Sequence, residues 1–282
     1  MFKWFSGFRF NGWRAGQRAS DRSVPAPAVP KRDRTLEAVI AHQRISILFQ
    51  PQINPVSGDI VGAEALARWD GAASPEALFA RAASAGLAER LSRMIQRKAL
   101  RIAATWEGSL KHLHLSINLL PQDLARAGYD QWLLDEIDAA GIDPKRITVE
   151  ITESALLADS DAIAERLAKL RAAGVRIAVD DFGTGYASLA YLTGLPLDIL
   201  KIDRGLIADI VGGARDRIVV KAMIALAREL DLEVVVEGVE STEQLALLAD
   251  WGCDLYQGFL GAGPLDDIEL TRFVTASMAE AA

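Results

Sequence analysis

The chain has 282 residues, of which 50% are hydrophobic and 24% are charged, and its formal net charge is -7. This composition is typical of a well-packed globular protein and excludes a mainly disordered one. The acidic balance argues against a nucleic acid polymer as partner, because such binding needs a basic surface. No apolar run reaches the ~18 residues of a membrane-spanning helix. A lone cysteine, Cys253, excludes an intramolecular disulfide and favours the reducing cytoplasm.

Residues 1–34 differ in composition from the rest of the chain. The first 22 residues mix Phe and Trp with Lys and Arg, and residues 23–34, SVPAPAVPKRDR, are rich in proline and charge. The first part lacks the continuous apolar core of a secretory signal, and the second is typical of a linker. We interpret residues 1–34 as an N-terminal arm with a Pro-rich linker, and we expect the arm at residues 1–22 to contact an anionic surface, such as the inner membrane, or a protein partner. A disordered tail is the alternative.

From residue 35 to residue 282, short apolar runs alternate with helical patterns. The runs expected to be strands are residues 46–50, 59–69, 112–118, 147–152, 175–181, 198–203, 232–238 and 254–258. Between them, stretches such as 161–174 and 215–232 place apolar residues three and four positions apart, as amphipathic helices do. Eight strand and helix units in roughly 250 residues predict one α/β domain with the fold of a TIM-like (β/α)8 barrel.

Polar side chains gather at the C-terminal ends of these strands, where barrels of this type carry their reactive groups. They are Glu64, Asn118, Glu150, Asp180, Asp181, Lys201, Glu237 and Gln257. Any one of them, taken alone, is usually a helix cap or a solvated side chain. Their spread over different strands favours a common site. Carboxylate and carboxamide oxygens without His or Cys suit Mg²⁺ or Mn²⁺, and the adjacent Asp180 and Asp181 are suited to bridging two ions for phosphoryl displacement.

Three other features are expected to be structural. His112 and His114 precede Asn118 on the same predicted strand, so they should lie toward the opposite end from the carboxylates. Cys253 follows a predicted helix and is expected to be a small buried residue. The turn FGTGY at residues 182–186 gives the backbone freedom to bend over the site. A lone Gly-x-Gly is more often an ordinary turn than a phosphate cradle.

Several motifs occur in order along the predicted barrel. They are FQP (49–51), EALARW (64–69), INLL (117–120), EITES (150–154), DDFGTGYASL (180–189), LKID (200–203), EGVE (237–240) and QGFL (257–260). From about residue 47 to residue 265, the chain resembles the EAL domain family, the bacterial cyclic-di-GMP phosphodiesterases of second-messenger signalling. The resemblance implies hydrolysis of one phosphodiester bond of cyclic-di-GMP to linear pGpG. It also implies two Mg²⁺ or Mn²⁺ ions as cofactors, and we expect Ca²⁺ to inhibit because its geometry is looser.

The resemblance also assigns roles to individual residues. The implied metal ligands are Glu64, Asn118, Glu150, Asp180, Asp181 and Glu237. The implied catalytic residues are Lys201, Gln257, Glu237 and Glu153, the last as an anchor for the loop at 180–186. The implied substrate contacts are Gln50, Arg68 and Pro264.

Two other functions stay open at this stage. One is a catalytically weak receptor that binds cyclic-di-GMP without turning it over and acts through protein partners. The other is an interaction protein with an inert barrel, in which the N-terminal arm makes the contacts. A homodimer is also compatible with the sequence, which does not specify the oligomeric state.

Overall fold

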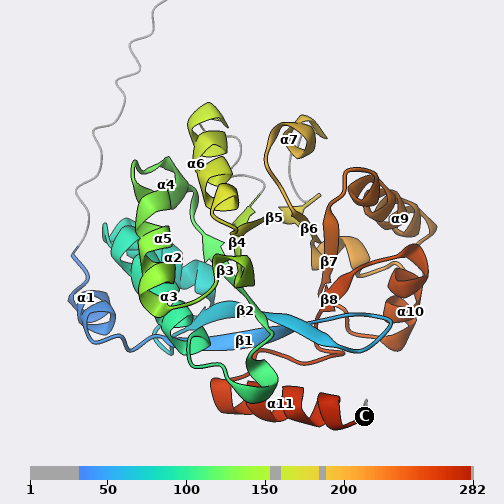
Figure 1. The fold of residues 1–282 in the computed structure, drawn as a ribbon, viewed down its shortest axis with the longest axis horizontal. Coiled ribbons are helices and arrows are strands. Elements are labelled where there is room, and N and C mark those ends of the chain that lie inside the picture. The colour runs from blue at the N-terminus through green and yellow to red at the C-terminus, as the bar shows by residue number, and fades with distance from the viewer. Residues whose placement is uncertain (1–31, 153–159, 184–188, 281–282) are drawn as a thin grey trace, which may run out of the picture. The chain divides into compact units, whose positions relative to one another are not determined.

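The computed structural model describes residues 32–152, 160–183 and 189–280 (Figure 1). The chain divides into two units, Met1–Pro30 and Lys31–Ala282, and the fold described here is that of the second. In this part of the chain, strands β1 to β8 form a closed barrel in sequence order. The expected TIM-like barrel is confirmed. Within the described ranges, no helix has both the length and the apolar character needed to cross a membrane.

The eight expected strands are present, with small shifts at their ends. They are β1 Ser46–Ile53, β2 Ile60–Arg68, β3 His114–Leu119, β4 Ile147–Thr152, β5 Arg176–Phe182, β6 Ile199–Ile202, β7 Glu233–Glu237 and β8 Leu255–Gln257. The strands are short, apolar and rich in β-branched residues, which favours buried parallel pairing.

The helices lie around the barrel (Figure 1). They are α1 Arg34–Ala41, α2 Pro75–Ser84, α3 Ala88–Ala103, α4 Pro121–Ala125, α5 Tyr129–Ala140, α6 Ser160–Ala172, α7 Leu189–Gly194, α8 Arg204–Ile207, α9 Ala214–Glu229, α10 Thr242–Trp251 and α11 Asp267–Glu280, with the 3₁₀ turns η1 Gly108–Leu110 and η2 Pro144–Arg146. The expected helices at 161–174 and 215–232 correspond to α6 and α9. Their apolar stripes explain the packing, because each helix buries one face against the sheet.

The first strand departs from the uniform pattern of parallel units. β1 runs antiparallel to both β2 and β8. Residues 54–59 connect β1 to β2 as a tight turn, in which Oδ1 of Asn54 accepts hydrogen bonds at 2.9 Å from the N–H groups of Val56 and Ser57. A parallel connection needs a crossover of about a dozen residues or more. The connection is too short for one, so it dictates a hairpin.

The barrel interior changes from apolar to polar along the strands. Ala178, Ile199, Val235 and Leu255 form a separate buried cluster. Each lies two positions before a polar residue of its own strand; these are Asp180, Lys201, Glu237 and Gln257. Because alternate residues of a strand face the same side, both sets point inward. The apolar residues therefore form a floor beneath a ring of polar side chains at the C-terminal end.

Candidate active site

Strand register places the polar side chains next to one another. Asn118 is opposite Glu150 in the β3–β4 pair, and Glu237 is opposite Gln257 in the β7–β8 pair. The antiparallel β1 contributes as well, since Gln50 is opposite Glu64. Residues directly opposite one another in a sheet lie close enough for their side chains to interact. The ladder thus gathers groups from across the chain at one end of the barrel.

The ammonium group of Lys201 lies among four carboxylates. Its Nζ is 2.6 Å from Oε1 of Glu237 and 2.7 Å from Oε2 of Glu150. The same atom is 3.2 Å from Oδ1 of Asp180 and 3.4 Å from Oε2 of Glu64. The side chain of Lys201 is only 1% exposed. Burial of so many like charges is tolerated because this cation lies between them.

Two amide side chains each bind a different oxygen of the Glu64 carboxylate. Nδ2 of Asn118 donates to Oε1 at 2.7 Å, and Nε2 of Gln257 donates to Oε2 at 2.8 Å. Nε2 of Gln257 also lies 3.1 Å from Oε1 of Gln50, whose own amide donates to the carbonyl of Ala262 at 3.2 Å. These bonds fix the orientation of Glu64 and connect it to the loop after β8.

The shared environment shifts the pKa values of these groups in different directions. Burial raises the pKa of Glu237 to about 8, against the charge of Lys201 and with the help of the Asp180 and Glu64 charges. Burial and the Glu64 charge raise the pKa of Glu150 well above its usual range. Burial alone would also raise the pKa of Glu64, but the Lys201 charge and the amide donors outweigh it and lower that pKa. Such divergence is typical of functional sites.

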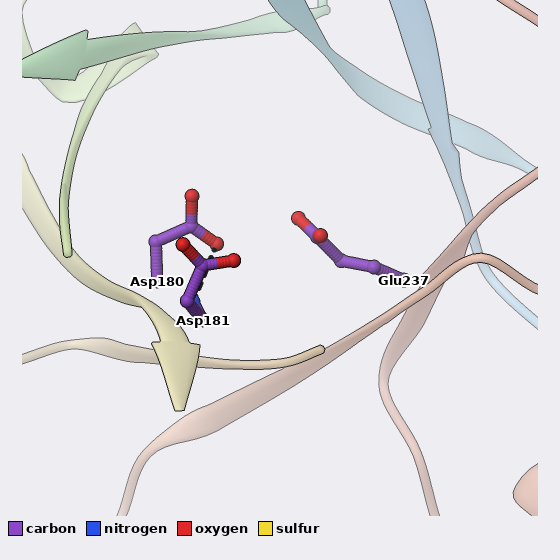
Figure 2. Close-up of side chains that lie close together, drawn as sticks. All are labelled: Asp180, Asp181 and Glu237. Carbon is purple, nitrogen blue, oxygen red and sulfur yellow. Dashed lines mark hydrogen bonds between the residues drawn. The ribbon is translucent and has the colours of Figure 1, made fainter. Parts of the chain in front are cut away.

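Asp180, Asp181 and Glu237 offer oxygen atoms that all lie within 4.8 Å of one another. Figure 2 shows the two aspartates of β5 side by side, with the carboxylate of Glu237 directed toward them from β7. Successive residues of a strand normally point to opposite faces. Here the β5–β6 register shifts between Val179 and Phe182, and Asp181 has a φ of 56°. The bulge therefore brings both carboxylates to the same side.

The donor set fits a hard divalent cation. It consists of carboxylate and carboxamide oxygens, which Mg²⁺, Mn²⁺ and Ca²⁺ accept as ligands. Among the described side chains, Oε1 of Glu150 and Oε1 of Gln257 are buried acceptors without a hydrogen-bond donor. Such orphaned acceptors are costly unless a further partner binds them. For the carboxylate of Glu150, a cation would supply that partner.

Comparison with known proteins identifies the family. Residues 33–264 match the profile of the EAL domain. The chain belongs to the EAL domain family. It is 35% identical over 252 residues to the cyclic di-GMP phosphodiesterase NbdA of Pseudomonas aeruginosa, which covers 88% of this chain and 32% of that protein. It is 34% identical over 244 residues to the bifunctional diguanylate cyclase/cyclic di-GMP phosphodiesterase MucR of the same species, covering 85% and 36%. The chain thus spans about a third of the length of these relatives.

Solved EAL structures have the same fold. The PaMucR phosphodiesterase in complex with c-di-GMP superposes with a TM-score of 0.78 at 33% identity, covering 83% of this chain and 97% of that one. A manganese/cy-diGMP complex of Klebsiella pneumoniae BlrP1 gives a TM-score of 0.72 at 32% identity, covering 78% and 56%.

Some predicted EAL site residues lie outside the carboxylate cluster. Arg68, at the end of β2, donates to the carbonyl of Ala67 at 2.9 Å and lines a separate cavity of about 290 Å³ with Trp69 and Pro75. Pro264 lies in the loop between β8 and α11. Glu153 falls outside the described residues.

Residues predicted to be structural lie away from the cluster. His112 and His114 line a cavity of about 400 Å³ with Asp59 and Val274. His114 begins β3, whereas Asn118 lies near its end, so the pair is at the opposite end of the barrel, as expected. Cys253 is 5% exposed, and its thiol donates to the carbonyl of Leu255 at 2.9 Å.

A group of polar residues that lies beside the carboxylate cluster was not identified from the sequence. A cavity of about 500 Å³ borders Glu64, Asn118 and Asp180, and Ser92 and Gln96 of α3 also line it. Both α3 side chains are buried, at 2% and 1% exposure. The available signal was their spacing of four residues on the apolar face of an amphipathic helix, where a polar residue requires a partner.

Proposed function

We propose that this EAL domain is a metal-dependent phosphodiesterase that hydrolyses cyclic-di-GMP to linear pGpG. The observation that carries the proposal is the convergence of five carboxylates from four strands around Lys201. They are Glu64, Glu150, Asp180, Asp181 and Glu237. Two findings on relatives support it: NbdA is named as a phosphodiesterase of this nucleotide, and the PaMucR structure is a complex with it.

The residues that would hold two Mg²⁺ or Mn²⁺ ions are Glu64, Asn118, Glu150, Asp180, Asp181 and Glu237. When bound, such ions polarise phosphoryl oxygens and lower the pKa of water, so that a nucleophile forms at neutral pH. The Lys201 ammonium is held by its ion pairs where it can offset charge that develops on the phosphoryl group in the transition state. Lys201 and the Gln257 amide would also orient the attacking water.

The remaining predicted residues have supporting roles in the proposal. Gln50 and Arg68 would contact the nucleotide, since their amide and guanidinium groups suit guanine edges or phosphate. Pro264, in the loop that Gln50 reaches through Ala262, would line the edge of the same surface. Glu153 would anchor the loop after β5 and so hold Asp181.

The direct test is an assay of the purified protein with cyclic-di-GMP and Mg²⁺ or Mn²⁺, with pGpG measured by chromatography. We expect hydrolysis, and we expect Glu64→Ala to lose ~10³-fold or more of it because the ligand set is broken. In Ca²⁺ we expect binding without hydrolysis, since the longer bonds position water poorly. Tight binding of cyclic-di-GMP with no pGpG formed in either Mg²⁺ or Mn²⁺ would overturn the proposal that the protein is an enzyme. It would instead favour a receptor that binds the nucleotide without hydrolysing it.

We also propose that residues 1–34 attach the barrel domain, residues 35–282, to an anionic membrane surface or a protein partner. With the membrane as target, the protein would be a cytoplasmic protein bound peripherally at the inner membrane. The mixture of aromatic and basic residues in the first 22 positions supports this. The test compares how much of the full chain, and how much of a chain starting at Arg34, sediments together with anionic vesicles. Equal amounts would contradict the membrane contact. A homodimer is proposed as the assembly, and sedimentation equilibrium tests it.

A further inference from the structure

A buried polar network lies between α3, α5 and the end of β3. The hydroxyl of Tyr129 donates to Oε1 of Gln96 at 2.7 Å. Nε2 of Gln96 donates to Oγ of Ser92 at 3.0 Å and to the backbone carbonyl of Asn118 at 3.1 Å. Ser92 in turn donates to Oδ2 of Asp123 at 2.5 Å. Tyr129 and Asp123 are both fully buried.

The direction of these bonds fixes the Gln96 amide in one orientation. Because the Ser92 hydroxyl gives its proton to Asp123, its oxygen is left to accept from the Gln96 N–H₂ group. The Tyr129 hydroxyl then faces the amide oxygen. A flipped amide would turn its oxygen toward two acceptors, the Ser92 oxygen and the Asn118 carbonyl, and would lose both contacts. The second N–H of Gln96 therefore stays directed at the carbonyl of Asn118.

Asn118 needs this support because the strand pairing around it is one-sided. The β2–β3 ladder ends at the Ala65–Ile117 pair, one residue before Asn118, whereas the ladder with β4 continues through Asn118 and Leu119. The side chain of Asn118 is itself exposed. On the other side of Leu119, the N–H of Leu120 donates to Oδ2 of Asp123 at 3.3 Å. The network therefore holds the backbone on both sides of Leu119.

We propose that Gln96 is a positioning residue that, through the Asn118 carbonyl, sets where the Asn118 amide lies and thereby tunes the metal affinity of the site. This inference rests on the proposed function, in which Asn118 is a metal ligand. Residues that hydrogen-bond to a metal ligand hold it in its binding orientation, and their loss typically weakens metal binding by about 10–100-fold. Gln96 touches no ligand side chain in the network described, so its effect passes through the backbone.

The test is a calorimetric titration of Mn²⁺ into metal-free protein, with thermal unfolding measured in parallel. Gln96→Met keeps the length of the side chain and removes its donors, so we expect the Mn²⁺ Kd to rise by about 10-fold. Saturating Mn²⁺ should bring kcat back toward the wild-type value. Tyr129→Phe leaves the Gln96 donors in place but removes the bond that orients them, so we expect a smaller rise in Kd.

Leu91→Ala is the matched control. Leu91 is a fully buried residue of α3 with no part in the network, so its truncation should lower the Tm and leave the Kd unchanged. A wild-type Kd in folded Gln96→Met would overturn the inference. If that variant does not fold, a wild-type Kd in both Tyr129→Phe and Ser92→Ala would overturn it. Absence of Mn²⁺ binding by the wild type would overturn the proposed function, and the inference with it.

Discussion

At the scale of single residues, Lys201 has the largest electrostatic role in the described site. Its ammonium group contacts four carboxylates and is almost completely buried. Burial by itself would lower the pKa of Lys201, but the charges of Asp180, Glu150, Glu237 and Glu64 raise it well above its usual value. The side chain therefore stays charged, because loss of the proton would leave the carboxylates uncompensated.

We expect Lys201→Met to separate substrate binding from turnover. With Mg²⁺ present, kcat for cyclic-di-GMP should fall by roughly 10²–10³-fold, the usual cost of removing one group that stabilises transition-state charge. The Kd for cyclic-di-GMP in Ca²⁺ should change much less, because most substrate contacts persist. Lys111→Met, at an exposed position after η1, is the control. A rise in Kd with kcat unchanged would show that Lys201 acts in ground-state binding instead.

At the scale of elements, the loops that follow β7 and β8 are packed backbone to backbone. The N–H of Val239 donates to the carbonyl of Gln257 at 3.1 Å, and the N–H of Leu260 donates to that of Val239 at 3.0 Å. A Cβ placed on Gly258 would lie 2.2 Å from the carbonyl oxygen of Val239. Glycine is required here by this close approach. The contact locks the ends of the two strands that carry Glu237 and Gln257.

Gly258→Ala should therefore disturb both folding and the site. We expect a loss of about 1–3 kcal/mol in the free energy of unfolding, as for overpacking of a close contact, together with a fall in kcat as Gln257 shifts. Urea unfolding and the pGpG assay measure the two effects. Gly212→Ala is the control, since a Cβ there would meet nothing within 4 Å. Wild-type stability in Gly258→Ala would mean that the two loops can separate at no cost.

At the scale of the whole barrel, closure of the sheet forces distant carboxylates together. Glu64 and Glu237 are far apart in sequence, yet both contact Lys201. These groups are not held close together in the unfolded chain, so a divalent ion that binds the cluster binds only the folded state. Under the proposed function, metal binding and folding would therefore be thermodynamically linked in this domain.

We expect Mn²⁺ to raise the Tm in a concentration-dependent way. A metal concentration of 100 times Kd should add about 2.7 kcal/mol to the free energy of unfolding. Differential scanning calorimetry with Mn²⁺ and with EDTA measures the shift. Asp180→Ala removes a carboxylate from the cluster and should reduce it. A Tm shift of equal size in Asp180→Ala would place the bound ion elsewhere on the molecule.

The barrel and most of its polar ring could be predicted from the amino-acid sequence. Short apolar runs, amphipathic helices and polar residues at strand ends are local patterns, so the barrel fold and the positions of Glu150 and Lys201 could be predicted from the sequence. The antiparallel β1 was not anticipated, although the short connection at residues 54–59 contained the signal.

The contacts among these groups could not be predicted from the sequence. That Lys201 reaches four carboxylates, that a bulge turns Asp181 to the side of Asp180, and that Gln96 of α3 meets the carbonyl of Asn118 all depend on contacts between distant segments. Side-chain direction at a bulge and partner choice in a buried network are set by three-dimensional packing. Local sequence patterns predict which face of a helix or strand a residue lies on. Its neighbours across the barrel depend on how the closed sheet brings distant strands together.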